Sequence, residues 1–138
     1  MIGLQEAEEI EDGIGRIGML QKKMTLEECC AFVKERFNLD TVKVFGDKNK
    51  VVKKAAICPG SGSDMIRTSI NKGADVLITG DINHHYGIDA VAQGLAIIDA
   101  GHYGLEHIFI NDMATYLSEN VKDVLVEKAE ILHPFEII

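Results

Sequence analysis

Two side chains that can bind a metal ion follow an apolar segment near residue 100. In LAIIDAGHYGLE, His102 and Glu106 are four residues apart, so they lie on one face of a helix that begins near Gly101 or His102. A neutral imidazole and a carboxylate suit divalent zinc, manganese or iron. Such a pair is also common as a hydrogen-bonded or solvated pair, and this alternative stays open. The same helical stripe continues through apolar residues, which predicts that the pair faces inward; they are Ile110, Met113 and Leu117.

The segment before this pair has the pattern of a strand buried on both faces. Residues 95–99 form an apolar run that ends on Asp99. Open α/β sheets place their sites outside the carboxyl ends of the strands, so the turn after this strand is a favourable place for a ligand site.

A second segment of this kind, TGDINHH, comes at the end of a strand expected at residues 75–79. Asp81, His84 and His85 are polar groups crowded into five residues, which is uncommon for packing reasons alone. We expect at least one of the two histidines to lie near the site.

A third segment, CPGSGSD, comes at the end of a strand expected at residues 51–58. Its glycines and the helix expected after it could let backbone N–H groups bind a phosphate or an oxyanion, and a tight turn is an equally good interpretation. The lysine and hydroxyl residue that end a P-loop are absent. Cys58 fits a small buried thiol better than a nucleophile, because no base is near it in sequence. The candidate anion-binding residues are Gly60, Ser61, Gly62 and Ser63.

The elements that must position these segments predict an α/β fold. Strand, loop and helix repeat three times between residues 51 and 120, which is typical of parallel βαβ units, so the three exit loops should meet at one edge of the sheet. We expect helices packed on a three-layer-like sheet, with an antiparallel hairpin. Further expected elements are a glycine-rich strand at 13–20, a capped helix at 25–37, hairpin strands at 41–45 and 51–58, helices at 64–72, 88–93 and 102–120, and a strand at 121–126.

Length and composition indicate one domain. The 138 residues can build a single core, and we expect it at residues 13–138 after an acidic lead-in or linker at 1–12. The net charge of −8 argues against nucleic acid as the main partner. Three cysteines, two of them adjacent, give no disulfide framework, which favours a reducing cytoplasm, and no apolar run is long enough to span a membrane. We expect the adjacent pair, Cys29 and Cys30, to pack in the core.

Four motifs in this order resemble the C-terminal half of a known family. GIGRIG, PGSGS, GADVLITGDINHH and GLAIIDAGHYGLE together are similar to the NIF-three-like dinuclear-metal-centre proteins, often called type 2 GTP cyclohydrolases. The resemblance covers about residue 13 to the end. It implies an α/β fold, ring-shaped hexamers and metal sites that face an internal cavity.

The resemblance also assigns roles to residues. It makes His102 and Glu106 ligands of a two-metal centre, and it places Asp81 and His85 beside those ligands. Family members take their remaining ligands, a paired-histidine motif and an aspartate, from an N-terminal half that has no counterpart here, since the first histidine is His84. The resemblance therefore implies a truncated or split member that carries half of a metal site, with a bound divalent ion or none.

Three candidate functions are compatible with these residues. The first is a metal-dependent hydrolase, cyclohydrolase-like, acting on a purine-like or phosphorylated substrate. The second is a non-catalytic assembly or interaction module that keeps the fold and the homo-oligomer surfaces without a complete metal centre. The third is an enzyme completed by a separate polypeptide that corresponds to the N-terminal half.

Overall fold

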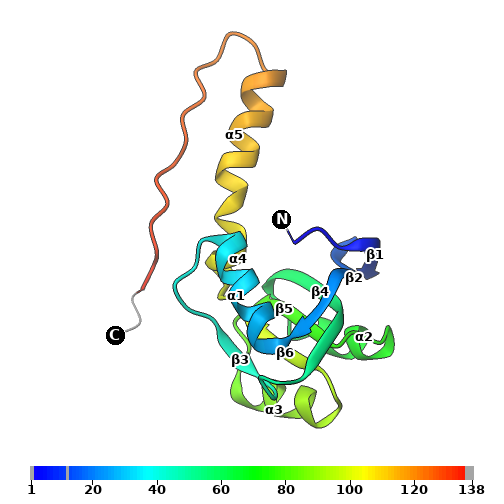
Figure 1. The fold of residues 1–138 in the computed structure, drawn as a ribbon. Coiled ribbons are helices and arrows are strands. Elements are labelled where there is room, and N and C mark those ends of the chain that lie inside the picture. Colours follow the sequence, from blue (N-terminus) through cyan, green and yellow to red (C-terminus); the bar gives the residue numbers. More distant parts are fainter. Residues whose placement is uncertain (1, 12, 136–138) are drawn as a thin grey trace. The chain divides into compact units, whose positions relative to one another are not determined.

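The computed structural model describes residues 2–11 and 13–135, and these fall into two compact units, residues 1–105 and 106–138. The first unit contains a six-stranded sheet in the order β1-β2-β4-β5-β6-β3 (Figure 1). Every helix within the described ranges is too short or too polar to cross a lipid bilayer. The strands are β1 (Gln5–Glu11), β2 (Ile14–Thr25), β3 (Lys43–Phe45), β4 (Val51–Ser61), β5 (Val76–Gly80) and β6 (Ala96–Asp99).

The centre of the sheet is parallel and its two sides are antiparallel. Strands β4, β5 and β6 pair in parallel, as the repeated strand-loop-helix pattern predicted. Strands β1, β2 and β4 pair antiparallel on one side, and β3 pairs antiparallel with β6 on the other. The helices are α1 (Leu26–Phe37), α2 (Met65–Asn71), α3 (His84–Ala92), α4 (His102–Glu106) and α5 (Ile108–Asn120).

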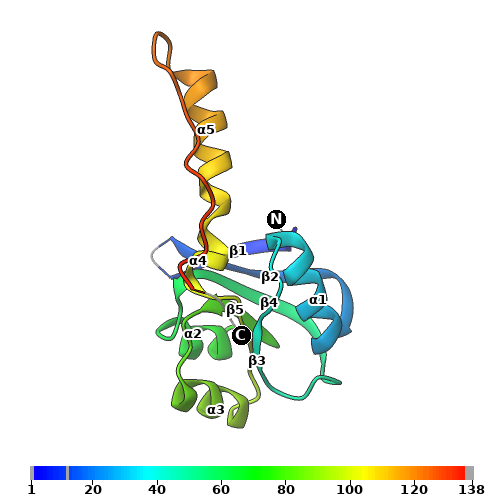
Figure 2. The same cartoon turned by 90° about the vertical axis from the view of Figure 1, so that its left-hand side faces the viewer.

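Helices cover both faces of this sheet. Figure 2 shows α1 on one side, and α2 and α3 on the other. Successive residues of β5 are all buried, as expected for a strand with helices on both faces. The predicted α/β architecture with three layers is therefore confirmed.

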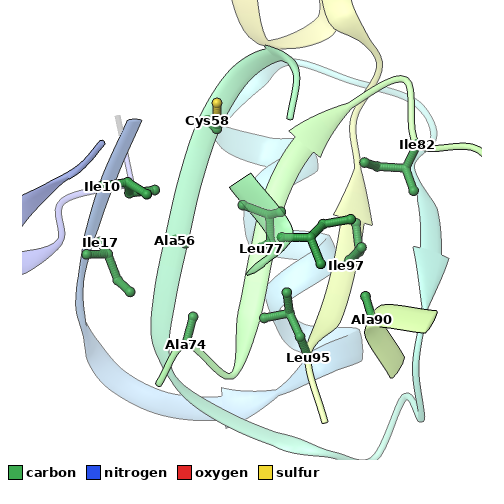
Figure 3. Packing of buried hydrophobic residues seen from close by; sticks show 11 residues of the cluster. Ile10, Ile17, Ala56, Cys58, Ala74, Leu77, Ile82, Ala90, Leu95 and Ile97 are labelled. Atoms are coloured by element: carbon green, nitrogen blue, oxygen red, sulfur yellow. The ribbon is translucent and has the colours of Figure 1, made fainter. Parts of the chain in front are cut away.

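The buried side chains between the sheet and the α2–α3 layer form one apolar cluster (Figure 3). Leu77 of β5 and Ile97 of β6 lie at its centre and are fully buried. Burial of a side chain of this size contributes roughly 1.5–3 kcal/mol. The cluster consists of Ile10, Ile17, Ala56, Cys58, Ile66, Ala74, Leu77, Ile82, Ala90, Leu95 and Ile97.

Helix α1 begins with the capping box that the sequence predicted. The Thr25 hydroxyl accepts the Glu28 N–H at 3.2 Å, and the Glu28 carboxylate accepts the Thr25 N–H at 2.7 Å. Both bonds satisfy N–H groups that the first turn of a helix leaves without partners. The helix buries Leu26, Cys29, Val33 and Phe37, whereas Cys30 is only partly buried.

Three local predictions were wrong. The acidic segment expected to be a lead-in contains strand β1, which pairs with β2 and forms the antiparallel hairpin of the fold. Strands β3 and β4 do not form a hairpin with each other, because β3 is the outermost strand next to β6 and is separated from β4 by β5 and β6. Residues 121–126 form no strand.

In the second unit, α5 buries Ala114, and the extended residues after the helix leave Leu125 and Leu132 exposed.

Candidate metal half-site at the sheet edge

The exit loops of the three parallel strands meet at one edge of the sheet, as predicted. Ser61 of β4 is in register with Gly80 of β5, and Thr79 with Asp99 of β6. A Cβ atom added at Gly80 would lie 2.5 Å from the His102 backbone nitrogen. The loops after β5 and β6 are therefore in direct backbone contact, and a side chain at position 80 would separate them.

The carboxylate of Asp99 organises this edge. Its Oδ1 accepts the N–H groups of Asp81 and Gly101, both at 3.0 Å, and its Oδ2 accepts the Ile82 N–H at 2.9 Å. Only 6% of the residue is exposed. One buried carboxylate thus holds the backbone of two different loops.

Lys43 supplies the opposite charge from the edge strand β3. Its Nζ lies 2.8 Å from Asp99 Oδ2 and donates to the Ile82 carbonyl at 2.7 Å. Because β3 runs antiparallel to β6, its first residue stands opposite Asp99 in the ladder. The buried negative charge therefore has a cationic partner, which it requires away from water.

His102 and Asp81 are brought together although they are far apart in sequence. His102 Nδ1 lies 3.1 Å from Asp81 Oδ2, and about half of each side chain is exposed. Asp81 has a φ of 55°, in the left-handed region. A carboxylate on Nδ1 favours the tautomer with its proton there and leaves Nε2 able to bind a metal.

Glu106 lies on α4 with His102, at the predicted four-residue spacing. Both residues are exposed, so the prediction that the pair faces inward was wrong. The single helix expected over residues 102–120 is divided in two, since α4 ends at Glu106 and α5 begins at Ile108. Metal binding by the pair stays a prediction.

His84 and His85 lie in the first turn of α3 rather than in an exit loop. The helix begins four residues earlier than predicted, because the Asn83 side chain accepts the Tyr86 N–H and caps it. Both histidines are exposed, and their rings lie 5.5 Å apart. Their expected place beside the metal ligands stays a prediction.

The candidate anion-binding residues are divided between a strand and a turn. Gly60 and Ser61 belong to β4, and the Gly60 carbonyl accepts the Thr79 hydroxyl at 3.3 Å. Gly62 packs against Thr79, where an added Cβ would clash with the hydroxyl oxygen, and Ser63 is partly buried. These contacts explain the glycines by close packing, and an anion contact stays a prediction.

The three thiols have the character of packing groups. Burial raises the pKa of Cys29 to about 12, and it also raises the pKa of Cys58, which is 3% exposed. Desolvation likewise raises the pKa of the partly buried Cys30. A thiol with a raised pKa carries little thiolate at neutral pH, which agrees with the interpretation of Cys58 as a buried thiol rather than a nucleophile.

The donor set does not make a complete metal centre by itself. No group of three histidine, cysteine, aspartate or glutamate residues within residues 2–11 and 13–135 is arranged to hold a metal ion. A catalytic zinc site normally has three protein ligands. The residues of this chain therefore fit part of a metal site, and no reaction step through a metal follows from them.

Sequence reasoning did not find two residues of this edge, Lys43 and Asp99. The available signal was Asp99 itself, a carboxylate at the end of an otherwise apolar strand, which must find partners when buried. Lys43 gave no signal, because β3 was assigned to a hairpin with β4.

Comparisons with known proteins agree on one family. The sequence profile of Duf34/NIF3 (NGG1p interacting factor 3) matches residues 1–133. Two proteins called GTP cyclohydrolase 1 type 2 homolog are similar to the chain. The one from Bacillus subtilis is 43% identical over 93 residues, covering 67% of this chain and 25% of the relative. The one from Clostridium perfringens is 37% identical over 134 residues, covering 93% and 50%.

Solved structures give the same result. The structure described as protein ybgI, of unknown function, matches with a TM-score of 0.82 at 27% identity, over 97% of this chain and 53% of that chain. A Bacillus cereus protein related to NIF3 matches with a TM-score of 0.78 at 30% identity, over 90% and 36%. The chain thus spans between a quarter and half of the two curated relatives described above.

Proposed function

Because the chain belongs to the Duf34/NIF3 family, we propose that it contributes part of a divalent-metal site in which His102 and Glu106 are ligands. Nε2 of His102 would be one donor atom and the Glu106 carboxylate the other. The spacing of the two residues on α4 suits a shared ion. Zinc, manganese and iron all accept this donor pair.

The observation that carries this proposal is the contact between His102 and Asp81. Histidines that bind metals generally donate their other ring N–H to a carboxylate or a carbonyl, which fixes the tautomer and turns the ring. The 3.1 Å distance from Nδ1 to Asp81 Oδ2 has this form.

The remaining ligands would come from outside this sequence. Two protein ligands do not hold a catalytic ion well, and the relatives are at least twice as long as the segment that this chain matches. A separate polypeptide that resembles the N-terminal half, or another copy in a homo-oligomer, is the source that we propose. The ring-shaped hexamer of the family would bring such copies together.

With a completed site, the activity that we propose is metal-dependent hydrolysis of a purine-like or phosphorylated substrate. The name of the relatives, GTP cyclohydrolase 1 type 2 homolog, points in this direction. A bound divalent cation would supply Lewis acidity for such a reaction. The role of the chain's own residues would be to bind the cation and to orient the imidazole.

A non-catalytic assembly module is the second candidate. The observation that favours it is the lack of any three-residue metal cluster in the described ranges. In this case the fold and its oligomer surfaces would carry the function, and the sheet edge would hold no ion.

Metal content and zinc affinity separate the two candidates. An incomplete ligand set binds zinc more weakly than a full one, so we expect the protein purified without chelator to bind zinc weakly in a titration. We expect His102→Ala and Glu106→Ala each to weaken this binding roughly tenfold or more. His133→Ala is the matched control, because it removes an exposed histidine of the tail and should leave the affinity unchanged. If the three variants bind zinc equally, His102 and Glu106 are not ligands and the metal proposal is wrong. If the wild-type protein binds no zinc, copies of this chain do not complete the site, and the assembly module is favoured over a site shared within a homo-oligomer.

A further inference from the structure

We infer that Asp99, together with Lys43, is the positioning residue of the half-site, because it orients Asp81 and through it the His102 imidazole. This inference rests on the proposed function and names a role that neither the motifs nor the family match assigns. Asp99 is buried, and its carboxylate contacts the three N–H groups and the Lys43 ammonium. It therefore acts through other residues rather than as a ligand.

The first step concerns the backbone of Asp81. A φ of 55° lies in the left-handed region, which aspartate adopts more readily than most residues but which still costs energy for a residue with a Cβ atom. Two successive N–H groups, of Asp81 and Ile82, donate to the two oxygens of the Asp99 carboxylate. These bonds hold the strained residue and fix the direction in which its side chain leaves the loop.

The second step concerns the backbone before His102. The Gly101 N–H donates to the same oxygen, Oδ1, that accepts the Asp81 N–H. The backbone of Asp81 and the backbone just before His102 are therefore hydrogen-bonded to the same atom, Asp99 Oδ1. Their 3.1 Å side-chain contact follows from this common anchor.

The third step concerns Lys43. Its ammonium group balances the buried charge and also binds the Ile82 carbonyl, so it links β3 to the loop that carries Asp81. Without this cation the carboxylate would be buried beside backbone groups alone, which is costly. A lysine at the start of an edge strand thus contributes to the orientation of a ligand on α4.

A carboxylate at the amino ends of the parallel strands, away from the half-site, provides a matched control. Asp75 Oδ2 accepts the N–H groups of Lys53 and Lys54, both at 2.8 Å, at the amino end of β5. The two aspartates therefore make the same kind of bond to the backbone, and only Asp99 is connected to His102. Loss of the hydrogen bonds at either aspartate should lower stability, but only their loss at Asp99 should change the tautomer of the His102 ring.

The test uses Asp99→Asn and Lys43→Met, with Lys43→Arg as the conservative variant and Asp75→Asn as the control. An amide offers one acceptor oxygen in place of two, so one or more of the three N–H bonds at Asp99 is lost. The first readout is the tautomer of the His102 ring, measured by ¹⁵N NMR on metal-free protein at about pH 8, where imidazoles are neutral. The second is zinc affinity, with zinc alone as the probe.

We expect wild-type protein and Asp75→Asn to show the Nδ1–H tautomer, and Asp99→Asn and Lys43→Met to show a mixture of tautomers. We also expect zinc to bind roughly 10–100-fold more weakly to these two variants, with recovery in Lys43→Arg. A folded Asp99→Asn with an unchanged tautomer would overturn the inference. Should wild type bind no zinc, the proposed function fails, and the tautomer still decides the positioning role.

Discussion

Lys43 and Asp99 stand opposite each other on strands β3 and β6, with Lys43 Nζ 2.8 Å from Asp99 Oδ2. This pair joins the edge strand to the carboxyl end of the parallel sheet, where the loops that carry Asp81 and His102 begin. The relationship depends on the antiparallel direction of β3, which brings the first residue of the strand, rather than its last, to this edge. The geometry of the half-site therefore depends on a strand that contributes no ligand.

Gly80→Ala should disturb the half-site through the backbone. The added Cβ would lie 2.5 Å from the His102 nitrogen and 2.6 Å from the Gly101 carbonyl carbon, and neither atom can move without shifting the loop after β6. We expect a loss of roughly 1–3 kcal/mol in the free energy of unfolding and a weaker affinity for zinc. Urea unfolding and a zinc titration would measure the two effects.

The control for this variant is Gly94→Ala. Gly94 has a φ of 88° and nothing within 4 Å of an added Cβ, so only backbone strain of about 1–2 kcal/mol is expected. Zinc affinity should stay at the wild-type value. Equal zinc affinities for Gly80→Ala and Gly94→Ala would contradict the close approach of the two loops as a determinant of the site.

Cys29 should make stability fall at alkaline pH. Burial raises its pKa to about 12 from an ordinary value of 9.0, so the folded state keeps a proton that the unfolded state releases. The stabilisation is fully present below pH 9 and is lost as the pH rises toward 12. In this window the slope approaches about 1.4 kcal/mol for each pH unit.

Cys29→Ala removes this titration. We expect its free energy of unfolding to be lower than that of wild type at pH 8, because the substitution leaves a cavity, and to decline less between pH 9 and 10.5. Parallel urea series at several pH values would show the difference in slope. Identical slopes for the two proteins would mean that Cys29 is not buried in the folded state.

Thr25→Ala should destabilise the N-terminus of α1. The threonine hydroxyl accepts the Glu28 N–H, and loss of such a cap costs about 1 kcal/mol. The hydrogen bonds that Thr25 donates lower the pKa of Glu28 from its ordinary value. The stabilisation from the Glu28 carboxylate is therefore present at neutral pH and is lost as the pH falls through the lowered pKa. Thermal unfolding of Thr25→Ala and Thr25→Ser would separate the cap from side-chain size, and we expect serine to retain the stability.

Local patterns predicted most of the parallel part of the fold. The apolar runs at β5 and β6 and the capping box at Thr25 each depend on neighbours in sequence, and each is present close to its predicted position. Strand β1 was missed because its glutamates hide the period of two, and among the side chains of that strand that the structure describes only Ile10 is buried. Pairing partners depend on distant residues, so β3 was assigned to the wrong neighbour.

For the candidate site, the sequence predicted which loops meet but not the hydrogen bonds that hold them together. The convergence of the three exit loops followed from parallel topology, and it brought Asp81 to His102. The exposure of His102 did not follow from the helical period, which also did not reveal that α4 ends at Glu106 and that α5 begins at Ile108. The role of Asp99 depends on three N–H groups supplied by two loops, and spacing along the chain carries no sign of such a network.

The most direct test of the metal half-site is an anomalous diffraction map from crystals of the chain grown with zinc, collected on both sides of the zinc absorption edge. We predict a peak about 2.0–2.1 Å from Nε2 of His102, with Nδ1 still on the Asp81 carboxylate. The peak should be absent from crystals of His102→Ala. A map with no peak at His102 in the wild-type protein, or with zinc only at other histidines, would contradict the proposal.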